Sequence, residues 1–233
     1  MLAFIAAEAR EFAGVLRHAK DVAKLDWPMD FARSATLNGR DVVLLANGPG
    51  PRLAARAAEI AKEHIDLQGL ISVGFCGALD PSLKPADIIV ARQVCGGPTN
   101  VTHALTVPRS QSSERKLGKL LSTDHVATTS EEKRMLHRET GSDAIEMEAA
   151  ALAAKATEWQ IPCFAVKAVS DMSCESLPLD FNRLRDAEGR FSRGKIILAA
   201  LRRPSLFPSL LHLNRRCNLA AEALGDFLAR SSF

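Results

Sequence analysis

The stretch at residues 143–171, DAIEMEAAALAAKATEWQIPCFAVKAVSD, contains the pattern that decides the fold. Residues 149–154 are five alanines and one leucine, and alanine has the highest helix propensity of all residues. Residues 161–169 form a short apolar run with a proline near its start, which is typical of a strand covered on both faces. The stretch therefore predicts a strand end, a helix and a buried strand in that order.

Carboxylates stand at both ends of this predicted unit. Glu146 and Glu148 come just ahead of the helix, where the helix dipole favours a negative charge. Asp171 follows the strand, and open α/β sheets place ligands beyond the carboxyl ends of their strands. We therefore expect Glu148 and Asp171 to face one crevice from two rigid elements.

The order of these motifs resembles the purine nucleoside phosphorylase and nucleosidase superfamily. EMEAA at residues 146–150 is followed about twenty residues later by VSD at 169–171, and the pair in this order is specific. LISVGFCGAL at residues 70–79 is similar to the glycine-containing strand end that borders the ribose in this family. The resemblance spans residues 1–171. It implies a single α/β domain with a mixed, partly barrel-like central sheet flanked by helices.

The resemblance also implies roles for the matching residues. Asp171 would protonate the departing purine at N7, and burial at an apolar strand end is expected to keep that proton in place. Glu148 would accept hydrogen bonds from the ribose hydroxyls, and Met147 would pack on the sugar. The alternatives are an aspartate that caps the following turn, and a Met147–Glu148 pair that is ordinary core and helix start.

Further substrate contacts are expected from neighbouring segments by position in the family. These residues are Phe75, Gly77, Val126, Ala127 and Ser170. Glu11 lies shortly after the first predicted strand, where nucleosidase relatives carry the glutamate that activates water. A plain surface carboxylate is the alternative for Glu11.

Water and phosphate both stay open as the acceptor of the sugar. Hexameric bacterial phosphorylases, which residues 73–78 resemble, carry Arg and Ser phosphate ligands where this chain has Ser72 and Phe75. Glycines at residues 47–51, ahead of a predicted helix, would let backbone N–H groups approach an anion. The candidate groups for a phosphate or nucleophile pocket are Arg10, Gly48, Gly50, Arg52, Gly74 and Lys167.

The remaining elements follow from local patterns. Asn38-Gly39 between two apolar runs is a hairpin signal, and Thr129 precedes two acidic residues as a helix cap does. Strands are expected at residues 1–7, 41–46, 70–79, 87–91 and 120–127. Helices are expected at 8–20, 51–65, after 130, at 191–201 and at 219–229. Residues 96–100 and 110–113 are expected to be loops.

Basic residues are concentrated at the end of the chain. Residues 183–233 contain ten Lys and Arg against four Asp and Glu, a charge of +6, which leaves −3 on the other residues because the whole chain carries +3. This separation favours an anionic partner, either a membrane surface or a nucleic acid. We interpret residues 1–182 as the phosphorylase-like domain and 183–233 as a basic, amphipathic helical extension packed on it.

Residues 202–217 mix arginines with apolar side chains and contain no acidic residue. The arginines are Arg202, Arg203, Arg215 and Arg216, and the apolar residues are Leu206, Phe207, Leu210, Leu211 and Leu213. Such a segment can lie in a bilayer interface, where four basic residues would contribute roughly 4 kcal/mol before ordering costs. Pro204 and Pro208 argue against one continuous helix. Packing of the leucines on the domain or on an oligomer partner is the alternative.

The LRRP-x-L-x-P-x-L-L pattern at residues 201–211 resembles the hopanoid-associated branch of the superfamily, whose members act on adenosylhopane. The expected reaction is cleavage of adenine from a 5′-modified adenosine, adenosylhopane first, by phosphorolysis or hydrolysis. A 5′-methylthioadenosine or S-adenosylhomocysteine nucleosidase is the alternative within the class, and a non-catalytic nucleoside-binding or membrane-docking protein is the alternative outside it. The partners expected are the nucleoside, lipid-linked in the first case, and further copies of this chain, but no nucleic acid.

Composition narrows the class further. A chain of 233 residues with 47% hydrophobic content can bury one sizeable core. Five cysteines without a CxxC pair favour a reducing compartment, and no apolar run approaches the length of a spanning helix. We expect a cytoplasmic protein with peripheral membrane contact. The histidines and cysteines show no metal-ligand spacing, so we expect no metal and no cofactor, with inorganic phosphate as an optional co-substrate.

Overall fold

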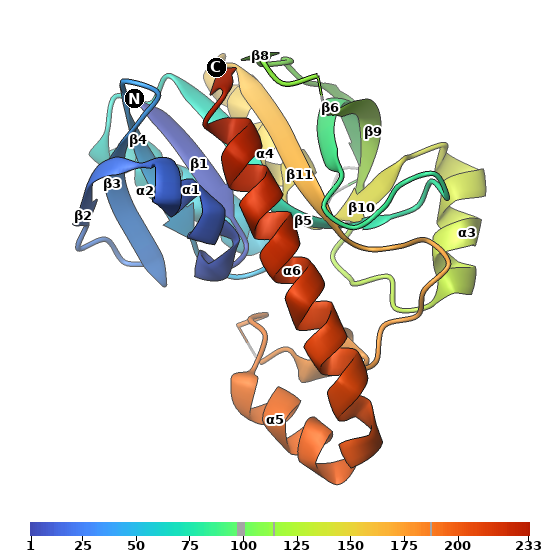
Figure 1. Ribbon diagram of the computed structural model, residues 1–233. Coiled ribbons are helices and arrows are strands. Elements are labelled where there is room, and N and C mark those ends of the chain that lie inside the picture. The colour runs from blue at the N-terminus through green and yellow to red at the C-terminus, as the bar shows by residue number, and fades with distance from the viewer. Residues whose placement is uncertain (97–100, 114, 187) are drawn as a thin grey trace.

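One mixed sheet runs through the molecule in this computed structural model, which describes residues 1–96, 101–113, 115–186 and 188–233 (Figure 1). The strands are β1 Leu2–Ala6, β2 Lys20–Lys24, β3 Phe31–Leu37, β4 Arg40–Ala46, β5 Gly69–Ala78, β6 Ile88–Gly96, β7 His103–Ala104, β8 Arg109–Ser110, β9 Lys116–Ser122, β10 Ala144–Glu146, β11 Cys163–Asp171 and β12 Ser231–Ser232. The α-helices are α1 Ala13–His18, α2 Pro51–His64, α3 Ser130–Thr140, α4 Ala149–Trp159, α5 Arg193–Arg202 and α6 Phe207–Leu228. Short 3-10 helices span Ala9–Phe12, Phe181–Leu184 and Pro204–Leu206.

The long strand β5 makes the sheet barrel-like. β5 pairs in parallel with β1 on one side and with β11 on the other, and its carboxyl end also pairs antiparallel with β10, where Ile145 lies opposite Gly77. Because β11 continues through β6 and β9 to β10, the five strands β5, β11, β6, β9 and β10 close into a ring. β1, β4, β3 and β2 extend the sheet beyond it. The predicted α/β fold with a mixed, partly barrel-like sheet is confirmed.

Helices cover both faces of the sheet. α2 and α4 pack on one face through small side chains, mostly alanine, that are buried against β1, β5 and β11. α1 and the second half of α6 pack on the other face, where Phe12, Leu224 and Phe227 join the core (Figure 1). Alanine-rich helices can lie close to a sheet, which explains how a strand as fully buried as β11 is covered on both sides.

Several local predictions are confirmed at the level of single residues. Asn38 and Gly39 both have positive φ values, 53° and 73°, in the β3–β4 hairpin. Thr129 caps α3 by accepting a hydrogen bond of 3.1 Å from the backbone N–H of Glu132. The helix expected at residues 51–65 is α2.

Other boundaries differ from the prediction. The strand expected at residues 120–127 ends at Ser122, because Thr123 and the following residues leave the sheet for the loop before α3. Residues 8–20 form a 3-10 turn and the short α1 rather than one helix. Ser110 pairs with the chain terminus in the small β8–β12 sheet, so residues 110–113 are not wholly a loop. Of the loop expected at 96–100, Gly96 ends β6 and the other residues lie outside the described ones.

The last helix is much longer than predicted. α6 begins at Phe207, twelve residues before the expected start, and runs unbroken to Leu228. Pro204 and Pro208 lie in the first turns of the last 3-10 helix and of α6, positions where a missing N–H leaves no helical bond unmade. The second half of α6 packs on the body, whereas α5 and the first half of α6 project from it as a hairpin (Figure 1).

Candidate active site

A cavity of about 400 Å³ opens where β5 and β11 end, at the base of the projecting hairpin. Its lining includes these residues from the sequence prediction: Arg10, Glu11, Phe75, Gly77, Val126, Ala127, Met147, Glu148, Ser170 and Asp171. The structure thus brings together residues from five separate segments of the chain. The expected crevice between Glu148 and Asp171 is present.

A buried lysine forms the floor beneath this cavity. The Lys167 ammonium lies 2.9 Å from Glu146 Oε2 and 3.3 Å from Glu148 Oε2, and it donates to the Val73 carbonyl at 3.1 Å. Burial disfavours its charge, but the two carboxylates hold the pKa of Lys167 above its ordinary value. Its three protons all have acceptors and its side chain is fully buried. The prediction that Lys167 contacts phosphate is therefore replaced by a role in fixing the two glutamates.

Glu146 joins the start of α4 to the sheet. Its carboxylate accepts hydrogen bonds from the backbone N–H groups of Glu148 and Ala149, at 3.0 and 2.9 Å, and from the Ser122 hydroxyl of β9. Burial opposes ionisation, but Lys167 and these hydrogen bonds hold the pKa of Glu146 below its usual range. Glu146 is thus an anion that orients the first turn of α4, and the sequence prediction gave it no such role.

Glu148 turns its carboxylate toward the pocket. Its Oε1 accepts a hydrogen bond of 3.1 Å from the backbone N–H of Gly50, the N-cap residue of α2. Burial raises the pKa of Glu148, and Lys167 counteracts part of that effect. Gly50 therefore contributes through its backbone to the position of Glu148.

Glu11 is buried at the edge of the same cavity, so the alternative of a surface carboxylate is wrong. Its Oε2 accepts from the Ala7 N–H at 2.9 Å, and its Oε1 accepts from the Phe75 N–H at 3.4 Å. Burial and the nearby Glu148 carboxylate raise the pKa of Glu11 from 4.5 to about 8. A group with that pKa can exchange a proton near neutral pH.

Two glycines of β5 make room for two carboxylates. A Cβ on Gly74, whose φ is +120°, would lie 2.6 Å from Glu11 Oε2. A Cβ on Gly77 would lie 3.1 Å from Asp171 Oδ2. Glu11 and Asp171 thus approach the strand closely at these two positions, and at Gly74 the positive φ also favours glycine.

Asp171 does not lie in the apolar surroundings that were expected. The buried ammonium of Lys133, from α3, contacts its Oδ2, and the Ser170 hydroxyl lies 2.6 Å from its Oδ1. Sequence reasoning missed Lys133 because it stands in the polar run SEEKR at residues 130–134. The available signal was its spacing: Lys133 shares a helix face with Leu136 and Thr140, and Leu136 packs inward.

Arg52 and Gly48 are not brought into the pocket wall. Arg52 donates to the backbone carbonyl of Glu188 and lines a neighbouring cavity with Asp124 and Arg185. A Cβ on Gly48 would collide with Leu53, so this glycine serves the tight turn into α2. Arg10 lines the pocket, and its guanidinium donates to Asn214 of α6 at 2.9 Å.

The far wall of the cavity is apolar, and none of its residues was among the predicted site residues. It comes from the segment after β11 and from the hairpin: Leu177, Phe181, Phe191, Leu210, Leu213 and Cys217. The longer α6 explains this wall, because Leu210 and Leu213 stand in the part of the helix that was expected to be irregular.

The fold and the pocket together define a class, the enzymes that break or exchange N-glycosidic bonds of nucleosides. The chain belongs to the phosphorylase superfamily, whose family model matches residues 30–122 and 103–201. It is an enzyme of the nucleoside phosphorylase and nucleosidase class.

Individual relatives are distant but cover most of the chain. An aminodeoxyfutalosine nucleosidase of Campylobacter jejuni is 22% identical over 78% of this chain and 90% of its own length. A 5′-methylthioadenosine/S-adenosylhomocysteine nucleosidase of Staphylococcus epidermidis is 24% identical over 80% and 92%. The solved structure of the Neisseria meningitidis enzyme of the latter name, in complex with methylthio-immucillin-A, superposes with a TM-score of 0.74 at 18% identity, covering 98% of this chain and 96% of that one. These similarities confirm the nucleoside phosphorylase-like fold.

Two negative findings concern the described part of the chain. None of its helices combines the length and apolar character needed to cross a membrane. Within the same residues, no three His, Cys, Asp or Glu side chains are grouped to hold a metal ion.

Proposed function

We propose that the protein cleaves the N-glycosidic bond of a 5′-modified adenosine and releases adenine. The observation that carries the proposal is the single pocket in which Glu11, Glu148 and Asp171 meet. Asp171 donates a proton to the purine as it leaves, and Glu148 accepts hydrogen bonds from the ribose hydroxyls. Met147, Val126 and Ala127 pack around the sugar and base, and Phe75, Gly77 and Ser170 complete the wall.

The acceptor in this proposal is water. Glu11 lies buried in the pocket with a pKa of about 8, which suits a base that takes a proton from water near neutral pH. Of Arg10, Arg52 and Lys167, only Arg10 lines the cavity, so among the described residues of the lining phosphate would meet a single arginine and no lysine. Backbone groups near Gly48, Gly50 and Gly74 are the remaining route to a phosphorylase.

Product analysis decides between the two acceptors. The purified protein is incubated with 5′-substituted adenosines in phosphate-free buffer and in buffer with added inorganic phosphate. We expect adenine and a free 5′-substituted ribose in both. Strict dependence on phosphate, with a ribose 1-phosphate product, would show phosphorolysis instead. No adenine from any substrate would favour a non-catalytic nucleoside-binding protein.

The 5′ substituent that we propose is large and apolar, as in adenosylhopane. The apolar far wall, with Phe181, Leu210 and Leu213, supports this choice because polar substituents would lose hydration there. The names of the Staphylococcus epidermidis and Neisseria meningitidis relatives instead favour 5′-methylthioadenosine or S-adenosylhomocysteine. Comparing kcat/KM for methylthio, homocysteinyl and long-alkyl 5′ groups tests the proposal, which requires the alkyl compound to be preferred.

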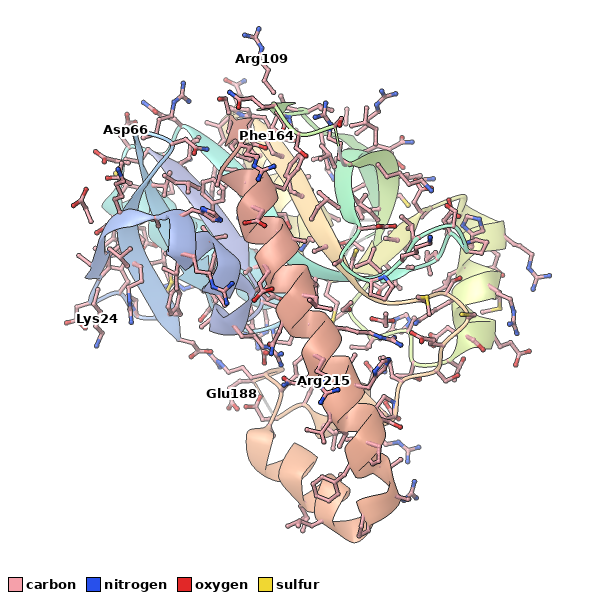
Figure 2. The ribbon with its side chains drawn as sticks, viewed as in Figure 1. Lys24, Asp66, Arg109, Phe164, Glu188 and Arg215 are labelled. Atoms are coloured by element: carbon pink, nitrogen blue, oxygen red, sulfur yellow. The ribbon has the colours of Figure 1, made fainter. Side chains whose placement is uncertain are left out.

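The projecting hairpin supports a peripheral contact with membranes. Phe207, Leu211 and Leu219 are exposed on α6, and Arg215 projects from the same helix near the hairpin (Figure 2). Arg216, counted with the lipid-facing arginines in the sequence, instead pairs with Glu175 on the body. A lipid-linked nucleoside would be reached more easily by an enzyme that rests on the bilayer.

We also propose a homo-oligomer, as in the family, since Val101, Val107 and Leu117 are exposed away from the pocket.

A further inference from the structure

Lys133 is a fully buried cation that neither the family motifs nor the reaction outlined above use. It stands in the first turns of α3, and its side chain has no exposed surface. Burying an ammonium group is unfavourable unless every proton meets an acceptor. The surroundings of Lys133 meet that condition.

The three protons of the ammonium have three partners. Lys133 Nζ contacts Asp171 Oδ2 and donates to the backbone carbonyls of Met172 and Glu175, at 2.9 and 3.1 Å. Met172 and Glu175 belong to the turn that follows β11. One side chain of α3 therefore holds both the Asp171 carboxyl group and the turn beside it.

The second oxygen of Asp171 has a different partner. Ser170 Oγ lies 2.6 Å from Asp171 Oδ1 and 3.2 Å from the Cys76 carbonyl oxygen. A hydroxyl has one proton, so it can donate to only one of these oxygens. Ser170 therefore donates its proton either to Asp171 Oδ1 or to the Cys76 carbonyl oxygen.

We propose that Lys133 is the positioning residue of the general acid: it holds Asp171 by Oδ2 and leaves Oδ1 to carry the proton that goes to the purine. The inference rests on the proposed function. As the C1′–N9 bond breaks, its electron pair stays with the purine, the proton moves from Asp171 Oδ1 to N7, and Asp171 becomes a carboxylate. C1′ bonds to the oxygen of the water whose proton Glu11 accepts. The Lys133 ammonium favours the carboxylate form of Asp171, so it assists the transfer of the proton from Oδ1 to the purine.

A change of leaving group tests this assignment. Adenine needs a proton to leave, whereas p-nitrophenolate is a stable anion that leaves without one. The wild type and Lys133→Met are compared on a 5′-substituted adenosine and on the p-nitrophenyl riboside with the same 5′ group. Because general acids contribute about 10²–10⁴-fold, we expect kcat for the adenosine to fall at least about tenfold and kcat for the nitrophenyl riboside to change little.

The matched control is Lys119→Met. Lys119 donates to the carbonyl of Thr140 at the other end of α3, away from Asp171, so this variant loses a lysine contact of the same helix. It should cleave both substrates like the wild type. If Lys133→Met does not fold, Lys133→Gln replaces it, because glutamine keeps a hydrogen-bond donor for the turn after β11. The same fall in kcat on the adenosine, with little change on the nitrophenyl riboside, is expected of this variant.

Two outcomes would overturn the role of Lys133 while leaving the proposed function in place. One is an equal loss on both substrates, which indicates a structural role, and the other is full activity of the Lys133 variants on the adenosine. Failure of the wild type to release adenine from any substrate would overturn the proposed function itself, and with it the acid that Lys133 positions.

Discussion

At the scale of single residues, the pocket works by keeping several buried charges in fixed relation. Lys167 contacts both Glu146 and Glu148, and its single charge helps to keep Glu146 ionised, whereas burial raises the pKa of Glu148. Burial, together with the nearby Glu148 carboxylate, raises the pKa of Glu11 to about 8. Carboxylates in one pocket thus hold protons differently, which is how a site obtains acid and base groups at one pH.

The first prediction concerns the proton donor. Asp171→Asn keeps the shape of the side chain but cannot give a proton to the purine, so kcat for adenine release should fall by about 10²–10⁴-fold. Substrate affinity, measured by equilibrium binding, should change much less. Wild-type turnover by the variant would show that Asp171 is the turn-capping residue that the sequence left as an alternative.

The second prediction uses the pKa of Glu11. Its folded-state pKa of about 8 lies above the ordinary 4.5, so between these values the folded protein holds a proton that the unfolded chain has released. Stability therefore declines as pH rises from about 4.5 through about 8, while hydrolysis, which needs ionised Glu11, increases over the upper part of that window.

Glu11→Gln should remove both pH effects. The variant should lose hydrolysis and should gain thermal stability over the wild type at about pH 9 but little at about pH 5, measured by calorimetry. Glu63→Gln, an exposed position on α2, is the control and should follow the wild type. Parallel stability curves for Glu11→Gln and the wild type would contradict the raised pKa.

At the scale of elements, the contact between α1 and α6 anchors the hairpin to the body. The two helices meet at glycines: a Cβ on Gly14 would lie 2.0 Å from the Ala221 carbonyl oxygen, and one on Gly225 would lie 2.2 Å from the Gly14 carbonyl carbon. The backbones are thus in direct contact, and no side chain fits between them. The position of Leu210 and Leu213 in the pocket wall depends on this backbone contact between α1 and α6.

The third prediction tests that contact. Gly225→Ala should force the helices apart and lower stability by about 1–3 kcal/mol, which for a chain of this size corresponds to a fall in Tm of several degrees. Gly194→Ala in α5, where a Cβ meets nothing within 4 Å, should leave Tm unchanged or slightly higher. Circular dichroism melts of the two variants measure the difference. Equal melting temperatures would mean that the contact between α1 and α6 at Gly225 does not hold α6 on the body.

At the scale of the whole molecule, the hairpin and the pocket lie at the same end. The basic, apolar hairpin projects at the end where the pocket opens, and the β8 segment with Arg109 lies at the opposite end (Figure 2). An enzyme resting on the hairpin would turn its pocket toward the bilayer. Leu211 is 60% exposed, and contact with a bilayer would cover this apolar side chain.

The fourth prediction follows from this arrangement. The protein should sediment with vesicles containing anionic lipid at low salt, and the doubly substituted Arg203→Gln, Arg215→Gln variant should bind more weakly, since each basic residue near anionic lipid contributes about 1 kcal/mol. Arg109→Gln, at the far end, should bind as the wild type does. Absence of sedimentation at low salt, or equal binding of all three proteins, would refute membrane docking.

Features that depend on neighbouring residues could be predicted from the amino-acid sequence. The alanine run predicts α4, Asn38-Gly39 predicts the hairpin, and Thr129 predicts the start of α3, because propensities, turns and caps act over a few residues. The order of the EMEAA and VSD motifs was enough to indicate the superfamily, and hence that Glu148 and Asp171 face the same pocket.

The burial of the charged groups and their contacts could be seen only in the folded molecule. Lys133 and Asp171 are 38 residues apart, and Gly50 and Glu148 are 98 apart, so no local pattern could reveal these pairs. Other elements of the fold determine whether Lys167 contacts phosphate or holds the two glutamates beneath the cavity. They also determine whether Glu11 is buried or lies at the surface. A charged group can be buried only where the assembled fold brings its counter-charge and hydrogen-bond partners to it.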